Sequence, residues 1–201
     1  SEMCIRDSCN KWFMEDILGS EDYAGLQARI APEKLGHNHV YFLPYLMGER
    51  SPINDTSARG TFIGMTMDTS RADMLQAVLE GVAFAIRDSF EVARSLGIAI
   101  PRSMICGGGS KSPLWRQMIA DILGIPLDIP VTEQGPGYGG AMLAMVACGV
   151  FESVQQAAEK LIHVKDTVQP DPERMALYEK RYQQFRQIYP ACRELFKVLE
   201  R

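Results

Sequence analysis

Apolar residues recur at intervals of three and four along several stretches of the chain, which is the spacing of one face of an α-helix. The most extensive pattern begins after Ser70, a residue type that favours helix N-termini, and stops at Leu96–Gly97, where glycine favours a helix end. It predicts a long helix between these points, with enough apolar surface to cover a sheet. The apolar face consists of Met74, Leu75, Val78, Leu79, Val82, Phe84, Ile86, Phe90, Val92 and Ala93.

Shorter helices are predicted where the same spacing is flanked by residues that start or stop helices. Four of them precede Phe151, at 10–18, between Ser20 and the turn-rich run 36–39, at 113–124 and at 141–148. Ser20 is the expected N-cap of the second of these helices, and Ser112–Pro113 opens the third. Beyond Phe151 the more polar sequence is also expected to be helical, with a long C-terminal helix that starts at Asp171–Pro172 and breaks at Pro190.

Short apolar runs bounded by turn-forming residues predict four strands, at 40–43, 61–66, 104–106 and 127–129. The connection between the first two, residues 44–60, carries two prolines and two glycines and is expected to be an irregular loop of the kind that often carries function. Strands alternate with helices along the chain. The predicted fold class is therefore α/β, a sheet covered by helices.

Composition places the chain among globular domains of ordinary size. It has 201 residues, of which 46% are hydrophobic and 23% charged, which allows one domain with a real core and argues against disorder. With 21 basic and 25 acidic residues the formal net charge is -4, and no block of Lys or Arg occurs. Nucleic acid and anionic membrane surfaces are therefore not expected as main partners, and the longest apolar stretch is too short to cross a bilayer. A small molecule is the expected partner.

The cysteine pattern favours a reducing compartment. Five cysteines occur without a Cys-x-x-Cys pair and only three histidines accompany them, so neither a disulfide framework nor a zinc site is predicted. Cys106, Cys148 and Cys192 lie among apolar or small neighbours, as free thiols do in the cytoplasm, which is the predicted location. Residues 1–8 share no periodicity with the rest of the chain and are predicted to be a non-native scar on a fragment.

The candidate ligand site is the run Gly107–Gly108–Gly109–Ser110–Lys111–Ser112, between a predicted strand and a predicted helix. Glycines lack the Cβ atoms that would block a ligand, and a helix N-terminus offers unpaired N–H groups to a phosphate or a nucleoside. A tight turn without a ligand is the alternative. The run matches neither G-x-x-x-x-G-K-[ST] nor G-x-G-x-x-G followed by a ribose-binding acid, so a dinucleotide-dependent oxidoreductase is disfavoured.

A second glycine-rich segment, 135–140, is predicted to be a turn in the same strand-to-helix setting and to form the facing wall of the same cleft. Gly139 and Gly140 would allow close helix packing there. A helix contact without a ligand explains these glycines equally well.

Arg50, within the loop 44–60, is the candidate for contact with an anionic substrate or a phosphate in the cleft, although a Glu49–Arg50 surface pair is the favoured alternative. Asp55 and Asp73 fit turn and first-turn positions better than the role of a catalytic base. The three histidines lack a Ser or Cys partner at a recognisable spacing and are expected to be structural.

Together these segments resemble the C-terminal domain of the FGGY family of carbohydrate kinases. Residues 60–65, a spacer of seven residues and residues 73–80 fit a signature of that family throughout. The run 107–112 resembles the family's adenosine-side motif, and 135–141 resembles a later glycine-rich segment, so that the resemblance covers about residues 9–197.

The resemblance implies the second half of an actin-like, ribonuclease-H-like kinase, in which ATP and sugar bind in a cleft between two such domains. Residues 9–201 would be its C-terminal nucleotide-binding domain with extra C-terminal helices. The N-terminal sugar-binding domain would be absent from the chain. The family's catalytic aspartate lies upstream of the matching region, so no catalytic residue and no metal ligand is assigned here, and the chain alone is expected to be inactive.

Within the family, residues 41–52 and 58–60 look most like the xylulokinases. The implied reaction is transfer of a phosphoryl group from ATP, with Mg²⁺, to the 5-hydroxyl of D-xylulose, a pentulose. The implied ATP-binding residues are Gly107, Gly108, Gly109, Ser110 and Ser112. Ser112 stands where relatives often have asparagine and would offer a side-chain hydrogen bond to the nucleotide.

Two other functions stay open. Gluconokinase-like members of the family share a segment similar to 41–52, so another sugar kinase of the family is one alternative. A non-catalytic actin-like module that binds nucleotide or a partner as a scaffold is the other. The expected partners are ATP, the pentulose and the absent N-terminal domain, with a homodimer as a further option.

Overall fold

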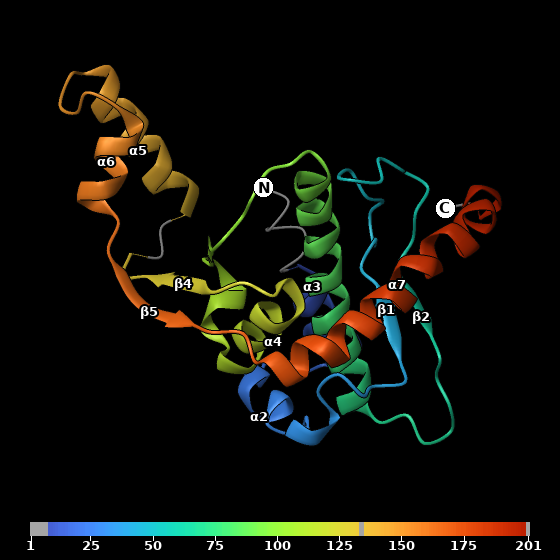
Figure 1. Cartoon of the computed structure of the whole chain (residues 1–201). Coiled ribbons are helices and arrows are strands. Elements are labelled where there is room, and N and C mark those ends of the chain that lie inside the picture. The colour runs from blue at the N-terminus through green and yellow to red at the C-terminus, as the bar shows by residue number, and fades with distance from the viewer. Residues whose placement is uncertain (1–7, 133–134, 200–201) are drawn as a thin grey trace.

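Helix α3 (Arg71–Ser95) runs through the middle of the molecule, with a small sheet on either side (Figure 1). The computed structural model describes residues 8–132 and 135–199, so the predicted scar at 1–8 lies almost entirely outside the described residues. The long predicted helix is confirmed. Ser70 Oγ accepts the N–H of Asp73 at 3.1 Å and Asp73 Oδ2 accepts the N–H of Ser70 at 2.9 Å, which is the reciprocal cap that starts a helix.

The strands form two sheets. Strand β1 (Tyr41–Leu43) pairs antiparallel with β2 (Thr61–Ile63). In the second sheet β3 (Ser103–Met104) lies parallel to β4 (Leu127–Pro130), which pairs antiparallel with β5 (Val164–Val168). All four predicted strands are therefore present, although β2 and β3 are shorter than expected, and α3 separates the two sheets.

Two features of the sheets differ from the sequence prediction. Strand β5 lies in a region that was expected to be helical, and its three central residues 165–167 are polar, so no apolar run marks it. Its pairing with the buried strand β4 determines its conformation. Strand β2 ends at Ile63 because Gly64 adopts a φ of 90°, and an added Cβ there would lie 2.4 Å from the carbonyl oxygen of His39.

The helices before Phe151 follow the prediction in part, with one wrong cap and a second helix that ends at Gln27, well before the turn-rich run 36–39. Those at 10–18 and 113–124 are confirmed, and Gly124 ends the latter in the left-handed conformation. Asp22 rather than Ser20 caps the second helix, because the Asp22 carboxylate accepts the N–H of Gly25 at 2.8 Å. The segments are η1 (Trp12–Ile17, a π-helix), α2 (Tyr23–Gln27), the 3₁₀ turns η2 (Pro32–Lys34) and η3 (Gly108–Lys111), α4 (Pro113–Leu123) and α5 (Gly135–Ala147).

After Phe151 come α6 (Val154–Leu161) and α7 (Pro172–Val198). Helix α7 starts at its predicted cap, Asp171, but the predicted break at Pro190 is wrong, because α7 continues through it. A proline inside a helix removes one N–H donor. The carbonyl that loses this donor belongs to Arg186, four residues earlier, and both Arg186 and Pro190 are exposed residues. No helix in the described segments is both long and apolar enough to cross a membrane.

The core forms where β1, α4 and α7 pack against α3. Aromatic rings fill the contact with α7, since the ring centroid of Phe84 lies 5.1 Å from that of Phe185 and 6.0 Å from that of Tyr182. A second aromatic group attaches the N-terminal segment, since the ring centroid of Phe42 lies 4.5 Å from that of Phe62 and 6.1 Å from that of Trp12. Such rings bury large apolar areas, so they bind distant segments of the chain to one core.

A buried ion pair joins α7 to α3. Arg181 Nη2 lies 2.6 Å from Glu80 Oε2, and the two residues are only 4% and 1% exposed. Gln76 donates to the other Glu80 oxygen at 2.7 Å, and Arg181 also donates to the carbonyl oxygens of Asn38 and Val40. Burial raises the pKa of Glu80, and the charge of Arg181 and the hydrogen bonds act against that rise. Loss of Arg181 would remove the cation that opposes this rise and leave the hydrogen bond from Gln76.

Replacing Arg181 by methionine should destabilise the protein by about 3–5 kcal/mol, because it leaves the Glu80 side chain buried without its cation. Chemical denaturation followed by circular dichroism measures the free energy of unfolding. Lys197→Met is the matched control, because Lys197 pairs with Glu194 at 2.7 Å on the surface, where an ion pair contributes about 0–1 kcal/mol. Equal losses for the two variants would contradict the role of the buried pair.

The cap of α3 predicts a loss of stability in acid. Burial alone would raise the pKa of Asp73, but hydrogen bonds from Lys34 at 2.7 Å and from Ser70 lower the pKa to about 2. The unfolded value is about 3.9, so the unfolded chain binds the proton more readily and this stabilisation, complete above about pH 5, is lost as the pH falls towards 2. The wild-type protein should therefore have a lower free energy of unfolding at about pH 3 than at about pH 5, and Asp73→Asn should make this decrease smaller. An equal decrease in the variant and the wild type would show that Asp73 does not cause the loss of stability in acid.

Candidate functional site

The glycine run lies where β3 meets α4. Gly107 follows β3, the turn η3 comes next, and Ser112 caps α4. Gly107 has a φ of 86° and a ψ of -165°, a combination that is essentially restricted to glycine. The backbone conformation of this turn therefore requires glycine at 107, whether or not a ligand is present.

Ser110 holds the turn closed from the inside. Its N–H and its hydroxyl both donate to the carbonyl oxygen of Gly107, at 3.1 and 2.6 Å. Ser110 and Gly109 are buried, whereas Gly107 and Gly108 are exposed. A ligand at this turn would therefore meet the backbone of Gly107 and Gly108, and the hydroxyl of Ser110 is already used within the turn.

Ser112 connects the turn to two other helices. Its Oγ accepts the N–H of Trp115 at 3.1 Å and donates its proton to Gln27 Oε1 on α2. The indole N–H of Trp115 donates to the carbonyl oxygen of Leu79 on α3 at 3.1 Å. Since the one hydroxyl proton of Ser112 goes to Gln27, Ser112 can contact a nucleotide only as an acceptor. The sequence analysis missed Gln27, because a single glutamine at the end of a short helix belongs to no motif.

The second glycine segment is helical, so the predicted turn at 135–140 is wrong. Helix α5 begins at Gly135, since glycine costs only about 1 kcal/mol in a helix and the apolar residues that follow are good helix formers. Its start lies beside the first turn, because an added Cβ at Gly135 would lie 3.8 Å from Cys106 Sγ.

The predicted close packing of α5 at Gly139 and Gly140 is not found in the described part of the chain. An added Cβ at either position would have no atom within 4 Å outside the neighbouring backbone of α5. Helices α5 and α6 contact each other and stand apart from the body of the molecule (Figure 1). These two glycines therefore face open space rather than a second wall.

The structure does not bring Arg50 to the glycine turn. Arg50 is exposed on the loop between β1 and β2, which lies on the other side of α3 from β3 and β4 (Figure 1). Among residues 8–132 and 135–199, no ion pair includes Arg50, so the Glu49–Arg50 surface pair is not formed. The side chain is a surface cation that an anion could reach from solvent.

The candidate acids serve the fold. Asp55 accepts the hydroxyl proton of Tyr189 at 2.7 Å and the N–H of Ser57 at 2.8 Å, and these bonds lower the pKa of Asp55. Asp73 belongs to the cap of α3. Within the described residues no three His, Cys, Asp or Glu side chains gather in a way that could hold a metal ion.

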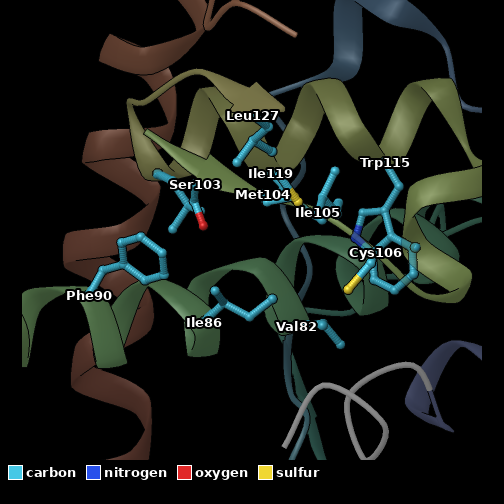
Figure 2. A pocket seen from close by; sticks show the side chains of 12 residues that line it. Val82, Ile86, Phe90, Ser103, Met104, Ile105, Cys106, Trp115, Ile119 and Leu127 are labelled. Carbon is cyan, nitrogen blue, oxygen red and sulfur yellow. The ribbon is translucent and has the colours of Figure 1, made fainter. Parts of the chain in front are cut away.

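An apolar cavity of about 80 Å³ lies between α3 and β3. Figure 2 shows Val82, Ile86 and Phe90 of α3 across from Met104 of β3, and Gly109 of the turn also lines the space. Sites for small molecules usually enclose about 300–1,000 Å³, so this cavity is too small for a nucleotide. A nucleotide would have to lie against the outer surface of the turn.

Comparison with known proteins places this arrangement in a family. Residues 4–148 match the family model described as the FGGY family of carbohydrate kinases, C-terminal domain. The chain is 33% identical over 189 residues to a xylulose kinase of Bacillus subtilis and 35% identical over 190 residues to one of Escherichia coli. Each alignment covers 94% of this chain but only 38% and 39% of the relative. The chain thus spans less than half the length of these relatives.

Solved structures agree with the sequence comparison. A xyloylose kinase from Brucella ovis superposes with a TM-score of 0.82 at 33% identity, covering 94% of this chain and 38% of that one. A gluconate kinase from Lactobacillus acidophilus gives 0.77 at 26% identity, over 92% of this chain and 37% of that one. The predicted α/β, actin-like and ribonuclease-H-like fold is confirmed by these neighbours. The family match, the identities and the fold agree: the chain belongs to the FGGY family of carbohydrate kinases, and its residues 4–148 match the C-terminal domain of that family.

Proposed function

We propose that this chain supplies the ATP-binding part of a sugar kinase that transfers a phosphoryl group from MgATP to the 5-hydroxyl of D-xylulose. The observation that carries the proposal is the 32–37% identity, over 89–97% of the chain, to six bacterial relatives named xylulose kinase. Those relatives are more than twice as long as the aligned segment, so the sugar and the catalytic base are assigned to a part of the kinase that this chain does not include.

The nucleotide is proposed to bind at the turn between β3 and α4. Gly107 and Gly108 are exposed and carry no side chain, so a polyphosphate or a nucleoside can approach their backbone closely. The adjacent N-terminus of α4 carries the partial positive charge of a helix dipole, which favours an anion. Gly109 and Ser110 maintain the shape of the turn from inside, and Ser112 fixes the start of α4.

The chemistry needs a base for the sugar hydroxyl, compensation of the charge that develops on the phosphoryl oxygens, and exclusion of water. Asp55 and Asp73 are both engaged in the fold, and neither is proposed as the base. Mg²⁺ is proposed to arrive with ATP, as part of the substrate. The contribution of this chain is therefore to bind the nucleotide and hold it in one orientation.

One alternative substrate has specific support. The gluconate kinase from Lactobacillus acidophilus resembles this chain nearly as closely in fold as the xylulose kinase from the same organism, with TM-scores of 0.77 and 0.79, and both are 26% identical to it. D-gluconate, a sugar acid, is therefore the second candidate for the substrate that accepts the phosphoryl group.

Gly107→Ala should weaken ATP binding to the chain by about 5- to 150-fold, because a Cβ at this φ and ψ forces the turn out of shape at a cost of about 1–3 kcal/mol. Isothermal titration calorimetry with MgATP measures the affinity. Gly97→Ala is the matched control, since Gly97 also has a positive φ, 77°, but no atom within 4 Å of an added Cβ and no place in the turn. Equal affinity of the Gly107→Ala variant and the wild type would contradict a nucleotide site at this turn.

The reaction is tested by a phosphoryl-transfer assay with MgATP on D-xylulose, D-ribulose, D-gluconate and glycerol. The product of the complete reading frame that encodes this chain is compared with the 201-residue chain alone. We expect transfer to D-xylulose by the former only. Preference for D-gluconate would favour the alternative acceptor. ATP binding without transfer to any of the four would contradict the kinase proposal and favour a nucleotide-binding scaffold.

A further inference from the structure

The side chain of Gln27 is almost completely enclosed at the start of α4. Gln27 is the last residue of α2 and is only 8% exposed. Its Oε1 accepts the proton of Ser112 Oγ, which places the amide at the cap of α4, next to the glycine turn. A polar side chain in such a position usually has all its hydrogen-bonding atoms satisfied, because an unpaired buried polar group is costly.

One atom of this amide has no partner among the described residues. Within the described residues Gln27 Nε2 makes no hydrogen bond, although an amide NH₂ can donate two. It is also not one of the fully buried polar atoms that lack a partner, so it keeps contact with solvent. Because Nε2 and Oε1 are bonded to the same carbon, the unused donor lies at the α4 cap and opens to the surface there.

We propose that Gln27 contacts the bound nucleotide directly, with Nε2 donating a hydrogen bond to an acceptor atom of the nucleoside. This inference rests on the proposed nucleotide site at the turn. Ser112 cannot supply this donor, because its proton is held by Gln27 Oε1. The amide is neutral and adds no positive charge of its own, so the acceptor assigned to it is an atom of the base or ribose.

The structure also separates this role from simple support of the turn. Gln27 acts on the fold through Oε1, which receives the Ser112 proton, and would act on the ligand through Nε2. A glutamate at 27 keeps an acceptor for Ser112 but has no donor. A methionine of similar length removes both groups. The two variants therefore distinguish a contact residue from a positioning residue.

Adenosine is the appropriate probe, because it carries no phosphate that a glutamate could repel. We expect Gln27→Met and Gln27→Glu both to weaken adenosine binding about 3–10-fold, the effect of one lost hydrogen bond. Gln187→Met is the control, since Gln187 is exposed on α7 and donates to the Gln183 carbonyl oxygen. Circular dichroism and thermal unfolding verify that each variant is folded.

A spectroscopic measurement tests the contact in the wild-type chain itself, where no residue has been substituted. The side-chain amide signal of Gln27 in a ¹H–¹⁵N spectrum, identified by its loss in Gln27→Met, should shift when adenosine is added, and that of Gln187 should not. If backbone signals of the turn respond to adenosine but the Gln27 amide does not, or if Gln27→Glu binds adenosine as tightly as the wild type, the inference is wrong and the nucleotide site stands. If no signal responds to adenosine or ATP, the nucleotide site itself is wrong, and the inference with it.

Discussion

The ion pair between Glu80 and Arg181 is the constraint on which the rest of the structure depends. Glu80 lies in the middle of the buried stretch of α3, where a carboxylate without a cation would be very costly. Arg181, on α7, pairs with Glu80 and donates hydrogen bonds to the carbonyl oxygens of Asn38 and Val40, just before β1. Three distant parts of the chain therefore meet at one point. The residue next to Glu80, Leu79, accepts the indole N–H of Trp115, so the same point of α3 also determines where α4 and the glycine turn lie.

Local chemistry explains which parts of the fold could be predicted. The cap at Ser70, the cap at Ser112 and the apolar spacing between them involve residues close in sequence, and the structure has these features where they were expected. Strand β5 could not be predicted, because its polar centre is held by β4, about forty residues away, where Asp128 accepts the hydroxyl proton of Thr167 at 2.7 Å. The local signal at Pro190 predicted a helix break that does not occur, because the tertiary contacts of α7 outweigh one lost hydrogen bond.

The candidate site could be located from the sequence but its internal roles could not. Glycines between a strand and a helix indicate a turn that exposes backbone, and Gly107 has the conformation that only glycine adopts readily. Which side chains face a ligand depends on neighbours that are far away in sequence. The hydroxyl of Ser110 donates to the carbonyl oxygen of Gly107 within the turn, and the hydroxyl of Ser112 donates to Gln27, eighty-five positions earlier. The family signature covers residues of the cap and of the buried pair, Asp73 and Glu80, so it marks the framework of α3 rather than a catalytic group.

The long separation between Glu80 and Arg181 also has a consequence for synthesis of the protein. The two residues are 101 positions apart, so at about 5–20 residues per second a ribosome adds Arg181 roughly 5–20 seconds after Glu80. Until then α3 carries a carboxylate on a surface that will later be buried, and that surface must stay hydrated. A contact that can form only late in synthesis therefore closes the centre of the molecule rather than its edge. A nascent chain without α7 has an incomplete core, even if its other helices have formed.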